Sequence, residues 1–79
     1  MNKDAIQKII EETLMSGKKY PNLLQLPKIL GIKSDLESAE STEEVVQILE
    51  ANRKSILKAF DLDESRYAEG INSILNLKA

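Results

Sequence analysis

The feature that most constrains the fold is an amphipathic stretch between Ser41 and Phe60, with the sequence STEEVVQILEANRKSILKAF. Ser41 and Glu44 have the S-x-x-E spacing of a capping box, in which each side chain accepts a hydrogen bond from the other residue's backbone N–H. At about 100° per residue, the apolar residues that follow share an arc of roughly a third of the helix circumference. They are Val45, Val46, Leu49, Ile56, Leu57 and Phe60. The pattern predicts one long central helix over 42–60, on which the rest of the chain packs.

Four other segments carry helical patterns. They cover 4–16, 21–31 with a break at Pro27, 35–40, and 63–76. No segment alternates apolar and polar residues strictly enough to predict a strand. The chain is therefore predicted to be all-α, a small compact bundle that forms a single domain over 1–79. It has four or five helices, depending on whether 35–40 is helical.

Local signals set the predicted ends of these helices. Asp4 and Asp61 each begin a D-x-x-E or D-x-x-Q pattern, which indicates an N-cap. Gly17 and Gly31 stand where a helix commonly ends. Met15 lies off the apolar stripe of the first helix, so we expect its side chain to be exposed.

The most apolar part of the chain is the segment 23–32, which holds six aliphatic residues. We expect this segment to be buried against the central helix. Gly70 lies inside the last predicted helix, where glycine costs up to about 1 kcal/mol relative to alanine. We interpret it as a place where another helix approaches closely.

The sequence contains no cysteine and no histidine. Disulfides, most structural zinc sites and catalysis by Cys/His or Ser/His/Asp groups are therefore excluded. Adjacent carboxylates such as Glu11 and Glu12 point about 100° apart on a helix and do not converge on one substrate. We expect no enzyme activity, no catalytic residues, no metal and no cofactor.

Targeting and membrane signals are also missing. The N-terminal residues contain no apolar h-region. No apolar run approaches the roughly 18 residues of a membrane span. Together with the lack of cysteine, these features predict a cytoplasmic protein without membrane association.

Charge is unevenly distributed along the chain, whose net charge is −2. Residues 1–33 carry six lysines and three acids, whereas residues 34–79 carry five bases and ten acids. The stretch from Asp35 to Glu44 holds five acids and no base. Such a run is typical of a solvated surface, and the alternative is a docking face for a basic partner.

Arg53 projects into the apolar arc of the central helix, and Asn52 lies at the edge of that arc. In one interpretation, Arg53 lays its methylenes on the apolar surface and sends its guanidinium to solvent or to a carboxylate. In the other, this part of the arc faces a partner protein, because arginine is enriched in interfaces. The candidate partner-binding residues are Arg53, Asn52, Asp35, Glu37, Glu40, Glu43 and Glu44.

The stretch LQLPKILGIKSDLES resembles the front half of a DNA-binding helix-turn-helix, in its leucine-rich helix that ends in L-G-I-K-S. It departs from that pattern at Pro27, where a small residue is usual, and at Glu37, where a buried aliphatic is usual. Acidic residues in the would-be recognition helix would repel phosphates, which argues against nucleic acid as a partner. Contacts to phosphate, if made, would come from Lys18, Lys19, Lys28 and Lys33.

Three functions remain compatible with these patterns. The first is a non-catalytic protein–protein interaction module, acting as a small regulator, adaptor or inhibitor of another protein. The alternative is a helix-turn-helix-like nucleic-acid-binding protein. The second alternative is a self-associating structural domain that forms a homo-oligomer.

Overall fold

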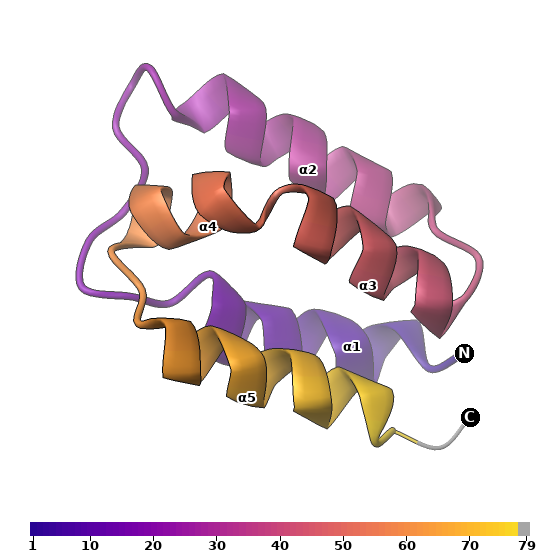
Figure 1. Ribbon diagram of the computed structural model, residues 1–79. Helices are drawn as coiled ribbons and strands as arrows, with labels where there is room; N and C mark the ends of the chain where they lie inside the picture. Colours follow the sequence, from indigo (N-terminus) through magenta and orange to yellow (C-terminus); the bar gives the residue numbers. More distant parts are fainter. Residues whose placement is uncertain (78–79) are drawn as a thin grey trace.

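The computed structural model describes residues 1–77, which fold into five α-helices and one π-helical segment (Figure 1). The elements are α1 (Lys3–Ile9), η1 (Ile10–Leu14), α2 (Leu26–Ser38), α3 (Thr42–Ala51), α4 (Arg53–Phe60) and α5 (Glu64–Leu75). The predicted all-α helical bundle is confirmed. The structure differs from the prediction in where several helices begin, break and end.

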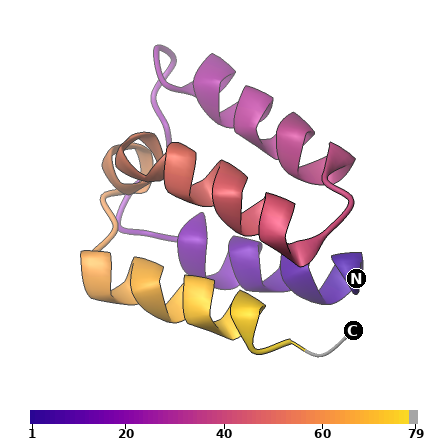
Figure 2. The ribbon, with the colours of Figure 1, turned by 45° about the vertical axis from the view of Figure 1, so that its right-hand side comes forward.

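The helices form a layered bundle in which α3 occupies the centre. Helix α3 packs against both α2 and α5, and α5 lies alongside α1 and η1 (Figures 1 and 2). The start of α1 and the end of α5 lie on the same side of the bundle (Figure 1). Side chains from every element fill the core between these layers. The largest fully buried ones are Tyr67, Leu14, Ile29, Leu49, Ile56, Ile74 and Val45.

The prediction of one long central helix is wrong, because the helix is interrupted at Asn52 and forms two helices, α3 and α4. Asn52 has φ −112° and ψ 16°, outside the helical region. Its side-chain Nδ2 donates a hydrogen bond to the Ile48 carbonyl oxygen at 2.8 Å. Such local side-chain bonding offers the backbone an alternative to the helical ladder. In Figure 2, α4 is seen almost along its axis whereas α3 runs across the view. The apolar arc is nevertheless covered, since Leu49 and Ile56 are both fully buried.

The first helical segment begins and ends differently from the prediction. Asn2, and not Asp4, is the N-cap, and its Oδ1 accepts a hydrogen bond from the Ala5 N–H at 3.1 Å. The segment ends in the π-helical turn η1, in which the Met15 N–H donates to the Ile10 carbonyl oxygen at 2.8 Å. A π-turn contains one more residue than an α-turn. We attribute the burial of Met15 to this extra residue, and the predicted exposure of Met15 is wrong.

Helix α2 runs without interruption through Gly31 and ends at Ser38. The prediction that Gly31 ends a helix and that 35–40 forms a separate one is therefore wrong. Gly31 does not adopt a left-handed conformation. Burial of Ile29 and Ile32 on one face holds the helix together across the glycine. Pro27 lies in the first turn, where proline is tolerated because that N–H has no intrahelical acceptor.

Two glycines mark close contacts between elements. A Cβ on Gly70 would lie 2.6 Å from Thr13 Oγ1 and 2.7 Å from Leu14 Cδ2, so this glycine lets α5 approach η1. The predicted role of Gly70 is confirmed. A Cβ on Gly17 would overlap the Phe60 carbonyl group. Gly17 therefore serves the close approach of the chain to the end of α4. The predicted helix end at Gly17 is wrong, because η1 ends at Leu14 with Met15 as its C-cap.

The connection between α4 and α5 also differs from the prediction. Asp61 has φ 48° and ends α4 in the left-handed conformation, so it is not the N-cap of the last helix. The N-cap residue of that helix is Asp63, two residues later in the sequence. Asp63 also lies 3.7 Å from the Lys18 ammonium, which places the loop after η1 beside the start of α5.

Candidate interaction surface

Arg53, the first of the predicted partner-binding residues, makes its contacts within the chain. Its guanidinium carbon lies 5.5 Å from the centre of the Tyr67 ring, and its Nη2 lies 3.7 Å from a Glu64 carboxylate oxygen. Its Nε is buried without a hydrogen-bond partner among the described residues. These contacts are those of the first interpretation, in which the arginine stem covers apolar surface and the charge meets a carboxylate. Binding of a partner by Arg53 stays a prediction.

Tyr67, the ring that Arg53 contacts, links two helices. Its side chain is buried, and its hydroxyl donates a hydrogen bond to the Leu49 carbonyl oxygen at 2.6 Å, which ties α5 to α3. Burial, followed by the charge of Glu50, raises the pKa of the Tyr67 phenol, whereas Arg53 lowers it. The phenol therefore stays protonated and keeps donating this hydrogen bond through neutral pH.

The other predicted site residues do not converge on one site. Asn52 is partly buried, and its side chain donates a hydrogen bond to the backbone of α3. The five acidic side chains are all exposed. Two of them lie at the end of α2, two in the first turn of α3, and one in the connection between these helices; they are Asp35, Glu37, Glu43, Glu44 and Glu40. Their role as a docking face for a basic partner stays a prediction.

The unusual surface of the molecule lies at the start of α2, where large apolar side chains face solvent. Leu23 and Leu24 are 87% and 92% exposed, and Tyr20 is 83% exposed. Leu30 remains 54% exposed and Leu26 39%. The prediction that this segment is buried against the central helix is therefore correct for Ile29 and Ile32 only. Exposed apolar groups that gather in one stretch mark interaction surfaces more often than isolated ones do.

Three of these leucines follow one another at helical spacing along the turn before α2 and α2 itself, and we call Leu23, Leu26 and Leu30 the leucine stripe. Their spacing of three and four residues places them within about 60° of one another around the helix. Ile29 and Ile32 are buried and lie on the adjacent side of the helix, with Ile29 about 60° from Leu26. The apolar residues thus form one broad arc, of which the bundle covers the part that holds the isoleucines. A helix that presents anchors at this spacing is typical of helix–helix docking.

The turn that carries Leu23 and Leu24 is fixed by hydrogen bonds at both ends. Asn22 Oδ1 accepts from the N–H groups of Leu24 and Gln25, at 3.0 and 2.9 Å. Gln25 Oε1 accepts in return from the Asn22 N–H at 3.0 Å. These reciprocal bonds form a capping box, and the Leu26 N–H already donates to the Asn22 carbonyl oxygen at 2.9 Å. The exposed leucines therefore lie on an ordered helical turn in the conformation that a partner would meet.

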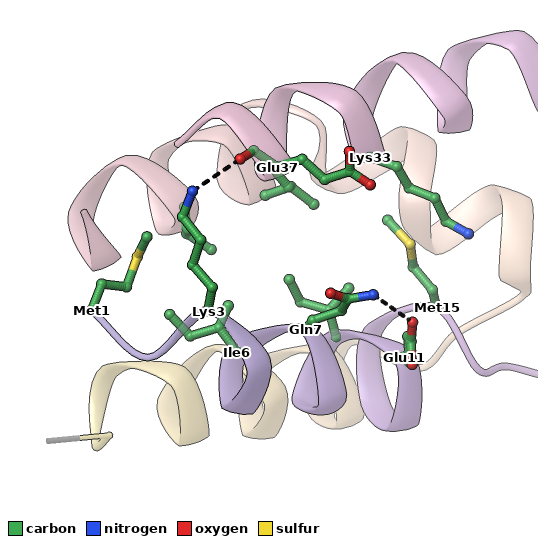
Figure 3. Close-up of a pocket in the computed structure, with 11 residues that line it drawn as sticks. Met1, Lys3, Ile6, Gln7, Glu11, Met15, Lys33 and Glu37 are labelled. Carbon is green, nitrogen blue, oxygen red and sulfur yellow. Dashed lines mark hydrogen bonds between the residues drawn. The ribbon is translucent and has the colours of Figure 1, made fainter. Parts of the chain in front are cut away.

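The same flank of α2 leads into a pocket between α1 and α2, which we call the α1/α2 pocket (Figure 3). Its volume is about 280 Å³. Apolar side chains contribute much of its lining, namely those of Met1, Ile6, Ile10, Met15, Leu36 and Val45. Lys3, Gln7, Glu11, Lys33 and Glu37 complete the lining. The Lys3 ammonium donates a hydrogen bond to the Glu37 carbonyl oxygen at 3.2 Å and links α1 to α2 at one end of the pocket. The volume is just below the roughly 300 Å³ at which small-molecule sites begin, so it suits one or two apolar side chains.

Lysines are the charged residues of the stretch that contains the leucine stripe, whereas the pocket lining holds two lysines and two glutamates. All four charged residues between Thr13 and Ser34 are lysines, and this stretch contains the leucine stripe. Among the described residues, Lys18 is the one of the four with a carboxylate at salt-bridge distance. The acidic stretch from Asp35 to Glu44 begins within the last turn of α2, on the side of the pocket. Helix α2 therefore carries positive charge toward its start and negative charge toward its end.

Sequence reasoning missed the leucine stripe because Pro27 and Gly31 suggested a broken helix. If 23–38 is treated as one helix, Leu23, Leu26 and Leu30 fall on a different part of the helix circumference from the buried isoleucines. This second stripe was the signal that could have identified the surface.

Family models, curated proteins and solved structures were compared with this chain, and none of them matched it. Within residues 1–77, no group of three or more acidic side chains is arranged to hold a metal ion. No helix in the same part of the chain is both long enough and apolar enough to cross a membrane.

Proposed function

We propose that this protein is a non-catalytic protein-interaction module that docks through the leucine stripe of α2. The observation that carries the proposal is the exposure of Leu23, Leu26 and Leu30 on one flank of a helix whose first turn is fixed by a capping box. Covering a leucine side chain removes about 1.5–3 kcal/mol of unfavourable hydration, so three adjacent leucines supply a substantial driving force for association.

The turn that carries the leucine stripe has a fixed conformation, which supports a role of these leucines in docking. A partner that meets a disordered segment must first order it, which lowers the affinity. Here the Asn22–Gln25 hydrogen bonds have already fixed the turn. The adjacent side of α2 is anchored in the core through Ile29 and Ile32. Docking therefore requires little rearrangement of this chain.

A regulator, adaptor or inhibitor of another protein would use this surface directly. The lysines that flank it favour a partner with carboxylates around an apolar groove. The acidic stretch 35–44 and Arg53 remain additional predicted contacts to such a partner. They lie outside the leucine stripe, so their contribution can be measured separately.

The test compares proteins retained by the immobilised wild-type chain with those retained by a Leu23→Glu/Leu30→Glu variant. A Leu75→Glu variant is the matched control, because Leu75 is 53% exposed on α5. We expect a specific partner to be retained by the wild type and by the control, and lost by the stripe variant. Retention of the same proteins by all three would refute docking through the stripe.

The two alternative functions give different results in parallel measurements. Binding of duplex DNA that weakens steeply with salt and with Lys28→Glu and Lys33→Glu would favour the nucleic-acid alternative. A concentration-dependent increase in mass, measured by light scattering on the purified chain, would favour self-association. Neither result is expected from a module that binds only a different protein.

A further inference from the structure

We propose that the α1/α2 pocket binds a small uncharged amphiphile, with an aliphatic body, one hydrogen-bond acceptor such as a hydroxyl oxygen, and about ten non-hydrogen atoms in all. The residues that line this pocket do not include Leu23, Leu26 or Leu30. The site is therefore separate from the leucine stripe, and the inference goes beyond the proposed function without depending on it.

The floor of the pocket consists of buried apolar side chains from three elements. Ile6 comes from α1, Ile10 from η1 and Val45 from α3. All three are buried in the core, yet they border an open volume of about 280 Å³. Transfer of aliphatic groups from water to such a surface is favourable. The floor therefore selects a ligand with an aliphatic body.

The π-helical turn η1 builds one wall of the pocket. The Met15 N–H donates to the Ile10 carbonyl oxygen at 2.8 Å, and both residues line the pocket. In an uninterrupted α-helix, two residues at this spacing point about 140° apart. The π-turn thus brings Met15 to the same wall as Ile10. Turns of this kind are rare and occur frequently at functional sites, which supports a binding role over a chance gap in the packing.

The volume of the pocket determines the size of the ligand. An apolar protein cavity of about 150 Å³ holds one benzene molecule. The α1/α2 pocket has nearly twice that volume, about 280 Å³, which corresponds to about ten non-hydrogen atoms. Such a molecule is comparable in size with two apolar side chains. Methionine adapts its shape to irregular contacts, so Met1 and Met15 can adjust the walls to the ligand.

The charges around the pocket are balanced, which favours a ligand without net charge. Two of the lining residues are lysines and two are glutamates, namely Lys3, Lys33, Glu11 and Glu37. A charged ligand of either sign would lie near two groups of its own sign, and such juxtaposition is unfavourable. An uncharged ligand avoids this cost.

Lys33 supplies the hydrogen bond to the polar end of the ligand. The Lys3 ammonium already donates to the Glu37 carbonyl oxygen at 3.2 Å. The Gln7 amide already donates to a Glu11 carboxylate oxygen at 3.1 Å. Within residues 1–77, no carboxylate lies at salt-bridge distance from Lys33. Its side chain extends from α2 toward the α1 side of the pocket (Figure 3). Because an ammonium only donates, the ligand contributes an acceptor.

Methyl NMR of the methionine-labelled chain tests this site with 1-octanol as the probe. The chain contains two methionines, and both line the pocket. We expect both methyl signals to shift and to saturate as 1-octanol is added. Signals that stay in place, or that drift without saturation, would overturn the inference.

A matched pair of glutamine substitutions locates the bound alcohol. Gln7 and Gln47 are both exposed on helices, and Gln7 lines the pocket whereas Gln47 lies on α3 outside the lining. Gln7→Trp should weaken 1-octanol binding several-fold, and Gln47→Trp should leave it unchanged. Leu36→Phe, which narrows the pocket from α2, is a second blocking variant. Circular dichroism checks that each variant is folded. Equal affinity in the wild type and in all folded variants would overturn the inference.

Charged analogues of the probe test the chemical class of the ligand. At neutral pH, octanoate and octylammonium should each bind several-fold more weakly than 1-octanol. Tighter binding of either ion would overturn the uncharged class. Lys33→Met keeps an unbranched side chain and removes the donor, so it should weaken 1-octanol several-fold and leave benzene binding unchanged. Equal weakening of both would mean that Lys33 only shapes the pocket, and would overturn its role as the donor.

The Leu23→Glu/Leu30→Glu variant separates this inference from the proposed function. It should bind 1-octanol as the wild type does, because the stripe lies outside the pocket lining. Loss of 1-octanol binding in this variant would place the alcohol on the leucine stripe and would overturn the inference. Docking of a partner protein through the stripe would remain as proposed.

Discussion

Tyr67 is the residue at which pH and stability are most directly linked. Burial raises the pKa of its phenol above the ordinary value of 10.0, so the folded state holds this proton more tightly than the unfolded chain does. The stabilisation is therefore fully present below about pH 10 and is lost as the pH rises above it. Tyr67→Phe removes this titration together with the hydrogen bond to Leu49.

We predict that Tyr67→Phe lowers the free energy of unfolding by about 1 kcal/mol at pH 7, because one buried hydrogen bond is lost. The difference from the wild type should shrink at pH values above 10, where the wild type loses the contribution of its protonated phenol. Urea unfolding of both proteins at neutral and alkaline pH measures this difference. A gap that stays constant across that range would contradict the role assigned to Tyr67.

Two helical glycines offer a matched pair of substitutions. A Cβ on Gly31 would contact nothing within 4 Å, so Gly31→Ala should stabilise the protein by up to about 1 kcal/mol through helix propensity. A Cβ on Gly70 would overlap Thr13 and Leu14. Overpacking typically costs about 1–3 kcal/mol, so Gly70→Ala should be destabilising despite the same gain in propensity. Thermal unfolding of the two variants should give shifts of opposite sign, and shifts of equal sign would contradict the packing at Gly70.

At the scale of single elements, the capped turn before α2 fixes the leucine stripe. We predict that Asn22→Ala lowers the free energy of unfolding by about 1 kcal/mol, because the N–H groups of Leu24 and Gln25 lose their acceptor. Hydrogen exchange at these two amides should become faster, while exchange at Ile56 in the core stays slow. Unchanged exchange at Leu24 and Gln25 would mean that the cap does not hold this turn.

The buried face of a helix could be predicted from the sequence wherever apolar residues recur with the 3.6-residue period of an α-helix. The buried positions of α3 and α5 follow the 3.6-residue pattern, and Leu49 and Tyr67 lie in the core as that pattern predicts. The bounds of α2 could not be predicted in this way. Pro27 and Gly31 are local signals for a break, whereas burial of Ile29 holds the helix together through contacts distant in sequence.

The candidate site was the least predictable part of the structure, for a physical reason. The sequence shows that the segment 23–32 is apolar. How many of its side chains become buried, however, depends on how the other helices pack. Arg53 looked like an intrusion into an apolar face, and its ring contact with Tyr67 depends on how α4 and α5 cross. Neither the burial of the segment 23–32 nor the contact between Arg53 and Tyr67 can be predicted from the spacing of residues within one helix.

At the scale of the whole molecule, the central claim is that a partner protein, and not solvent, covers the leucine stripe when this molecule functions. Methyl NMR of the leucine-labelled chain, recorded with and without the proteins that the immobilised wild type retains, tests this claim most directly. The account predicts that the methyl signals of Leu23, Leu26 and Leu30 shift together and saturate as these proteins are added, whereas those of Leu75 on α5 stay in place. Stripe signals that do not move, or that move no more than those of Leu75, would contradict it.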